Sequence, residues 1–175
     1  MLSKELTDKY QLVVGLEVHA QLATSSKLFA EDAIGFGADP NTQVSVISLG
    51  HPGTLPKLNM RAVEFAVRMG LACQCTINRH SSFDRKNYFY PDLPKGYQIT
   101  QDKEPICLGG KVPILLEDGS ELAVQLNRIH LEEDAGKLIH APQKEASWVD
   151  FNRAGTALIE IVTEPCLRSS EEAVT

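Results

Sequence analysis

Several carboxylates and one histidine stand inside otherwise apolar segments that look like strands. Glu17 and His19 interrupt one such segment, Glu133 closes a second, and Glu160 lies within a third. A buried carboxylate is costly unless it is paired or bound to a cation. Side chains two residues apart on a strand point the same way, about 6 to 7 Å apart, so Glu17 and His19 could converge on one ion. If the three segments share a sheet, the four side chains form a mainly carboxylate floor suited to Mg²⁺ or Mn²⁺, and His19 leaves Zn²⁺ open. The alternative for each acid is the solvated face of an antiparallel strand.

A second group of candidate residues lies where cations and aromatic rings alternate. Between residues 82 and 98, Arg85 and Lys86 precede Tyr88 and Tyr90, and two prolines interrupt the segment. Arginine and lysine bind phosphate oxygens, and an aromatic ring can pack against a base or a sugar. We therefore take Arg85, Lys86 and Tyr88 as candidate nucleotide-binding residues. The plainer interpretation is a well-packed surface loop.

Arg153 is a further candidate because it lies in a polar, glycine-containing segment, residues 150–156. An arginine here could stabilise charge on a transferring phosphoryl group, or it could pair with Asp150 in a turn. Residues 109–111 read Gly-Gly-Lys but lack the first glycine and the Ser/Thr of a P-loop, so they do not predict a phosphate cradle.

The composition is that of an ordinary globular chain. It has 175 residues, 43% of them apolar and 23% charged, which is enough for one core. No apolar stretch approaches the roughly 20 residues of a membrane span, and the first residues are charged rather than signal-like, so we expect a cytosolic protein with reduced cysteines. The net charge of −6 argues against binding nucleic acid mainly through phosphate contacts.

The elements that must position these residues are short. Alternation predicts a strand over residues 12–22, and further strands are expected at 42–49 and 158–163. Residues 60–72 predict a helix that begins after Asn59. The dipeptides Gly-Gly at 109–110 and Asp-Gly at 118–119 predict the turns of hairpins between residues 105 and 131. A capping pattern opens a second helix after Ser169, and because the chain stops in its first turn we expect a piece of a longer protein. The fold class expected is α+β, with a mainly antiparallel sheet and flanking helices.

Five ordered segments resemble the GatB family, the B subunits of aspartyl/glutamyl-tRNA amidotransferase. They read VGLEVHAQL (14–22), DRKNYFYPD (84–92), HLEEDAGK (130–137), DFNRAGT (150–156) and LIEIV (158–162). The resemblance implies that residues 1–175 are the amino-terminal part of a cradle-shaped domain similar to the catalytic fold of glutamine synthetase, without the downstream helical and tail domains.

The resemblance also implies site residues. It implies that Glu17, His19, Glu133 and Glu160 bind Mg²⁺, and that Lys86, Lys95 and Asp134 lie along a polar path for ammonia. Two positions depart from the family pattern: Cys166 stands where an Asp is usual, and Ala157 where a Pro is usual.

The function implied is that of a carbon–nitrogen ligase with glutamine as nitrogen donor. ATP phosphorylates the side-chain carboxylate of Glu-tRNA(Gln) or Asp-tRNA(Asn), and ammonia then displaces phosphate. A glutaminase A subunit and a C subunit complete a heterotrimer, and the missing downstream domains hold most of the tRNA. We expect the isolated piece to be inactive. The alternatives are a non-catalytic module that docks the A and C subunits, and the archaeal GatE-type relative.

Overall fold

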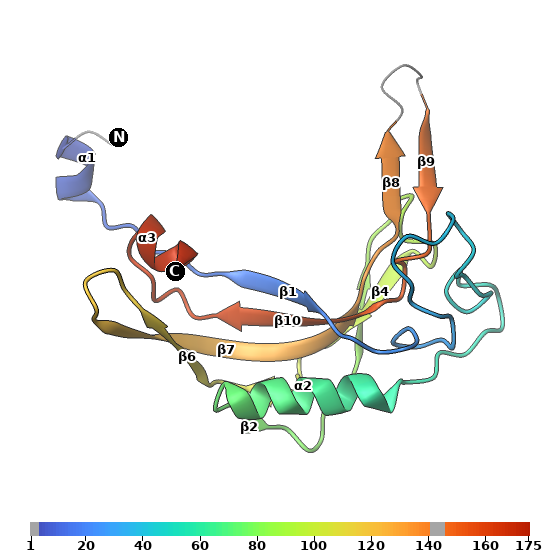
Figure 1. The fold of residues 1–175 in the computed structure, drawn as a ribbon, viewed down its shortest axis with the longest axis horizontal. Coiled ribbons are helices and arrows are strands. Elements are labelled where there is room, and N and C mark those ends of the chain that lie inside the picture. The colour runs from blue at the N-terminus through green and yellow to red at the C-terminus, as the bar shows by residue number, and fades with distance from the viewer. Residues whose placement is uncertain (1–3, 141–145) are drawn as a thin grey trace.

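An open antiparallel sheet forms the framework of the protein (Figure 1). The structure, a computed structural model, describes residues 4–140 and 146–175. Its strands are β1 (Glu17–Gln21), β2 (Thr76–Ile77), β3 (Asp84–Asn87), β4 (Tyr97–Thr100), β5 (Cys107–Leu108), β6 (Lys111–Leu115), β7 (Glu121–Glu133), β8 (Lys137–His140), β9 (Ser147–Asp150) and β10 (Ala157–Thr163). Its helices are α1 (Lys4–Lys9), α2 (Met60–Ala72) and α3 (Ser170–Val174). The expected α+β class with a mainly antiparallel sheet is confirmed.

The long strand β7 organises the main sheet. The order is β1-β10-β7-β5-β2, and β6 pairs with the first half of β7. Strands β3 and β4 form one separate hairpin and β8 and β9 another, and Figure 1 shows the latter projecting from one end of the sheet. The predicted strand at 158–163 is confirmed as β10, whereas the first predicted strand is shorter, with Glu17–Gln21 in β1 and an isolated bridge from Val14 to Leu167. Segment 82–98 contains β3 and the start of β4, so it is not simply a loop.

Helix α2 begins and ends where the sequence predicts. The Asn59 side chain accepts a hydrogen bond from the N–H of Arg61 at 3.0 Å and so caps the first turn. Small residues at positions 62, 66 and 70 are the buried residues of the helix. They let α2 lie close against one face of the sheet, where Ile129, Leu131 and Ile159 form the core. Helix α3 likewise begins after Ser169, whose hydroxyl accepts from the N–H of Glu172.

Gly70 is the closest point between α2 and the sheet. A Cβ atom at this position would lie 2.4 Å from Cys107 Sγ and 2.8 Å from Ile77 Cδ1. We expect Gly70→Ala to lower the free energy of unfolding by about 2 kcal/mol, because overpacking outweighs the gain of about 1 kcal/mol in helix propensity. Urea unfolding measures the change. Adding Cys107→Ala should restore most of the loss, and a stabilised single variant would contradict the packing argument.

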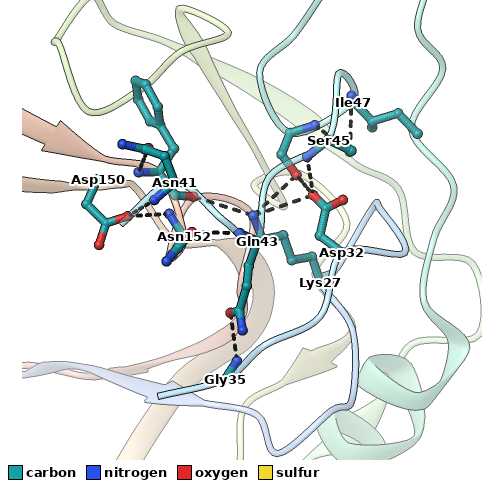
Figure 2. Close-up of polar contacts among 11 residues, drawn as sticks. Lys27, Asp32, Gly35, Asn41, Gln43, Ser45, Ile47, Asp150 and Asn152 are labelled. Atoms are coloured by element: carbon teal, nitrogen blue, oxygen red, sulfur yellow. Dashed lines mark hydrogen bonds and ion pairs between the residues drawn. The ribbon is translucent and has the colours of Figure 1, made fainter. Parts of the chain in front are cut away.

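The segment 42–49 folds into turns, so the strand predicted there is wrong. Its backbone donors bond to side chains instead of a neighbouring strand. The N–H of Gln43 donates to Asn152 Oδ1 at 2.8 Å, and just before the segment the N–H of Asn41 donates to Asp150 Oδ1 at 3.1 Å. Figure 2 shows these contacts with the end of β9 and the loop that follows it. Asn and Asp side chains compete with strand pairing in this way.

A lysine with no solvent exposure lies beside this contact. Lys27 Nζ is 3.5 Å from Asp32 Oδ2 and 3.4 Å from Ser48 Oγ. Asp32 also accepts hydrogen bonds from the Ser48 hydroxyl and, at 3.1 Å, from the N–H of Ser45 (Figure 2). Burial lowers the pKa of Lys27, and the negative charge of Asp32 partly offsets that effect. The pair ties the irregular segment after β1 to the interior.

The Gly109–Gly110 pair is not the turn of a hairpin, contrary to the prediction. Strands β5 and β6 both pair with β7 and not with each other. The two glycines therefore connect two successive strands that lie along β7. Gly110 has φ +101°, and a Cβ there would lie 2.6 Å from the Cys73 carbonyl oxygen. The predicted turn at 118–119 is confirmed between β6 and β7. Within the described part of the chain, no helix is long and apolar enough to cross a membrane.

Candidate metal and nucleotide site

The face of the sheet opposite α2 carries a row of ionisable side chains. In the register of the sheet, His19 of β1 lies opposite Glu160 of β10, which lies opposite His130 of β7. Because side chains alternate along a strand, Glu132 projects from the same face as His130. Three strands that are far apart in the sequence therefore bring four ionisable groups together.

Two of the predicted metal ligands are neighbours in this row. His19 Nε2 is 3.4 Å from Glu160 Oε2 and 2.8 Å from Glu132 Oε1. One ligand atom from each of these three residues lies within 4.8 Å of the others, a spacing at which they could hold one metal ion. The carboxylates are mostly buried, with side-chain exposures of 5% for Glu132 and 13% for Glu160, while His19 is about half exposed.

Glu133, the third predicted ligand, does not join this group. It follows Glu132 and so projects from the opposite face of β7, in phase with Ile129 and Leu131. Its carboxylate forms an ion pair with Lys95 and accepts a hydrogen bond from the N–H of Ile99 at 2.9 Å. Glu132 occupies the place beside His19 and Glu160 that the sequence analysis gave to Glu133.

Two cavities meet at this group. The larger, about 500 Å³, is lined on the sheet by Glu17, Arg128, His130, Glu132 and Glu160. The other, about 440 Å³, has walls that include His19, Glu132 and Asp134. Glu132 is common to both. Glu17, the fourth predicted ligand, is exposed and lies outside the close group. Its negative charge nevertheless helps to raise the pKa of Glu160.

The pKa values of Glu132 and Glu160 shift in opposite directions. Burial raises the pKa of Glu160, and the neighbouring charge of Glu132 raises it further. Burial alone would also raise the pKa of Glu132, but the neighbouring imidazoles of His130 and His19 hold it below its usual range. Adjacent carboxylates repel when both are ionised, and a bound cation relieves that repulsion.

The candidate phosphate-binding residues line the larger cavity. Arg85 and Lys86, both on β3, are exposed and face it across from Glu132 and Glu160. The guanidinium of Arg85 lies 4.5 Å over the Tyr97 ring, which limits its freedom. Tyr88 lies in the second cavity. The structure therefore separates Tyr88 from the two cations with which the sequence grouped it.

Of the remaining candidates, Asp134 lines the second cavity, while Arg153 and Lys95 each contact a residue of its lining. Burial raises the pKa of the Asp134 carboxyl group. Arg153 Nε lies 3.4 Å from Asp134 Oδ2, and the arginine also donates to the carbonyls of Ala135 and Gly136. Arg153 thus pairs with Asp134, and the predicted alternative of a pair with Asp150 is not what forms. Lys95 is buried against Glu133.

Residues 12–175 match the family model described as the GatB/GatE catalytic domain. The chain belongs to this family.

Relatives named as the B subunits of aspartyl/glutamyl-tRNA(Asn/Gln) amidotransferase are similar to nearly the whole chain. The one from Nitratidesulfovibrio vulgaris (strain DP4) is 59% identical over 165 residues, covering 94% of this chain and 34% of the relative. Those from Symbiobacterium thermophilum and Caldicellulosiruptor saccharolyticus are each 56% identical, covering 95% and 94% of this chain and 35% and 34% of their own lengths. The chain spans about a third of the length of these relatives.

In this GatB/GatE domain, sequence reasoning missed Arg128, His130 and Glu132 as site residues. All three project from one face of β7 into the larger cavity. A signal for them was present, because Ile129 and Leu131 are apolar and must face the core, which leaves 128, 130 and 132 for the opposite face. Glu133, in phase with the apolar residues, belongs to the core side.

Proposed function

We propose that this chain is the part of a tRNA-dependent amidotransferase that holds a divalent cation and ATP, within the B subunit of that enzyme. The enzyme would phosphorylate the side-chain carboxylate of Glu-tRNA(Gln) or Asp-tRNA(Asn), and ammonia would then displace phosphate to leave the amide. The observation that carries the proposal is the group formed by His19, Glu132 and Glu160 at the meeting point of two cavities. The names of the relatives support the amidotransferase part of this proposal.

The residues present fit a divalent cation. Two buried carboxylates and one imidazole give a negatively charged set of donors that suits Mg²⁺ or Mn²⁺, and Glu17 on the same strand face as His19 offers a further oxygen. We propose His19, Glu132 and Glu160 as the ligands. A cation held there neutralises charge on the phosphates of ATP. Glu133 is engaged by Lys95 and is not proposed as a ligand.

The cations of the larger cavity are placed to bind the triphosphate. Arg85 and Lys86 face the carboxylates from β3, and Arg128 lies beside them on β7. They hold phosphate oxygens and offset the charge that develops during transfer. Tyr88 and Asp134 line the second cavity, where we propose that the acceptor carboxylate binds.

When ammonia displaces phosphate, its nitrogen loses one proton, which finally leaves with the phosphate as HPO₄²⁻. Asp134 is suited to accept it, because burial raises the pKa of its carboxyl group and makes it a stronger base. Lys86, Lys95 and Asp134 would lie along the polar path by which ammonia arrives. Arg153 fixes the Asp134 carboxylate from the other side. Ammonia itself would come from glutamine in a partner A subunit, with a C subunit completing the complex.

Nucleotide binding by the chain tests the proposal. Titration with a non-hydrolysable ATP analogue and Mg²⁺ should show saturable, metal-dependent binding. Arg85→Gln should weaken it about tenfold, the worth of one charge-assisted hydrogen bond. Arg68→Gln, on the exposed side of α2, is the matched control and should bind as the parent does. A chain that binds no nucleotide would instead support the alternative of a module that only docks partner subunits.

A further inference from the structure

His130 contacts both clustered carboxylates but is placed differently from His19. Its Nε2 lies 3.3 Å from Glu160 Oε2 and 3.6 Å from Glu132 Oε2. It is not a member of the three-residue group whose ligand atoms all lie within 4.8 Å of one another. The two histidines therefore meet the same pair of carboxylates from different sides, one at the edge strand and one inside the sheet.

The other nitrogen of His130 is engaged by Arg128. Arg128 Nε donates to His130 Nδ1 at 3.4 Å. A guanidinium has no lone pair to offer and only donates, so Nδ1 must accept and carry no proton. In the neutral ring the proton then lies on Nε2, the nitrogen that lies within 3.3 to 3.6 Å of the carboxylate oxygens. An Nε2 that carries a proton can donate to a carboxylate but cannot bind a metal ion.

Burial also distinguishes His130 from His19. The side chain of His130 is 4% exposed and that of His19 is 51% exposed. His19 can turn toward an ion that enters from solvent, whereas His130 is fixed within β7 between its neighbours. Carboxylates that bind metal ions are commonly held by a further hydrogen-bond donor, and loss of that donor weakens metal binding.

We propose that His130 is a positioning residue, which Arg128 holds in the Nε2–H form so that it orients Glu132 and Glu160 toward His19 without binding the cation itself. This inference rests on the proposed metal site. It assigns the two histidines opposite tasks, since His19 accepts the cation and His130 donates to the groups that accept it. It also gives Arg128 a task beyond binding phosphate.

Mn²⁺ serves as the probe, with affinity measured by titration and the bound ion examined by pulsed electron paramagnetic resonance for coupling to imidazole nitrogen. The parent chain should show coupling to one imidazole, and His19→Gln should abolish it. His130→Gln, which keeps an N–H donor near the position of Nε2, should retain the coupling and bind Mn²⁺ almost as tightly as the parent. His130→Leu should lower the affinity about tenfold or more and retain the coupling. Imidazole coupling that disappears in His130→Gln, or unchanged affinity in His130→Leu, would overturn the proposal.

Because His130 is buried, a second variant keeps the test decisive should His130→Leu fail to fold. Arg128→Met leaves the imidazole in place, and nitrogen-15 NMR of the ring should show loss of the pure Nε2–H form together with weaker Mn²⁺ binding. An unchanged tautomer and affinity would contradict the role of Arg128. If the parent chain bound no Mn²⁺, the proposed metal site itself would be wrong. If the His130→Leu and Arg128→Met variants bound Mn²⁺ as the parent does, only the role of His130 would be wrong.

Discussion

Glu132→Gln is expected to weaken Mn²⁺ binding on the order of 100-fold, because it removes one of two negative charges from the proposed ligand group. Glu132 lies 2.8 Å from His19 Nε2, and its carboxylate is shared by both cavities. Without metal, the variant should be slightly less stable than the parent chain at neutral pH, since the lowered pKa of Glu132 means that its ionised form stabilises the fold. Titration with Mn²⁺ and thermal unfolding in a chelator measure the two effects.

Glu133→Gln is the matched control, one residue away with the same change of charge. It should bind Mn²⁺ nearly as the parent does but lose about 3 kcal/mol of stability, because it leaves Lys95 buried without its partner. The two neighbouring glutamates should thus show opposite signatures. If Glu133→Gln instead abolished metal binding and Glu132→Gln did not, the ligand set of the sequence analysis would be correct and the one proposed from the structure wrong.

Lys27→Met is expected to lower the free energy of unfolding by about 3 kcal/mol, since it leaves the Asp32 carboxylate buried without a cation. The exposed Lys57→Met should change stability by less than about 0.5 kcal/mol. Urea unfolding at neutral pH measures both.

A double-mutant cycle shows whether the pair causes the loss. Lys27→Met combined with Asp32→Leu removes both charges, and it should be more stable than the sum of the single changes predicts. Strict additivity would mean that Lys27 contributes through packing alone. In that case the ion pair would not be what holds the segment after β1 to the interior.

The sequence was a good guide to the elements whose causes are local. Helix α2 has its cap at Asn59 and its apolar side within one stretch of chain, and the tight turn at 118–119 joins neighbouring strands. Segment 42–49 has the composition of a strand, but its donors are taken by Asn152 and Asp32, and only the folded chain brings those residues near.

For the site, the sequence indicated the strands that come together but not which side chains on them are neighbours. His19 and Glu160 come together because β1 and β10 pair in one register, which periodicity within a single strand does not fix. The choice between Glu132 and Glu133 could be made from the apolar phase of Ile129 and Leu131. The ion pair of Glu133 with Lys95 depends on a long-range contact and could not.

Among the described strands, β1 lies at the edge of the sheet and pairs on one side only, with β10. An edge strand is the part of a sheet that opens most easily, since fewer contacts hold it. Because β1 carries His19, a cation shared with Glu132 and Glu160 would also fasten this strand to the interior of the sheet. Metal affinity and protection of the β1 amides from solvent exchange are therefore two measures of one equilibrium. Metal binding would therefore hold the edge strand β1 in place and make it open less often.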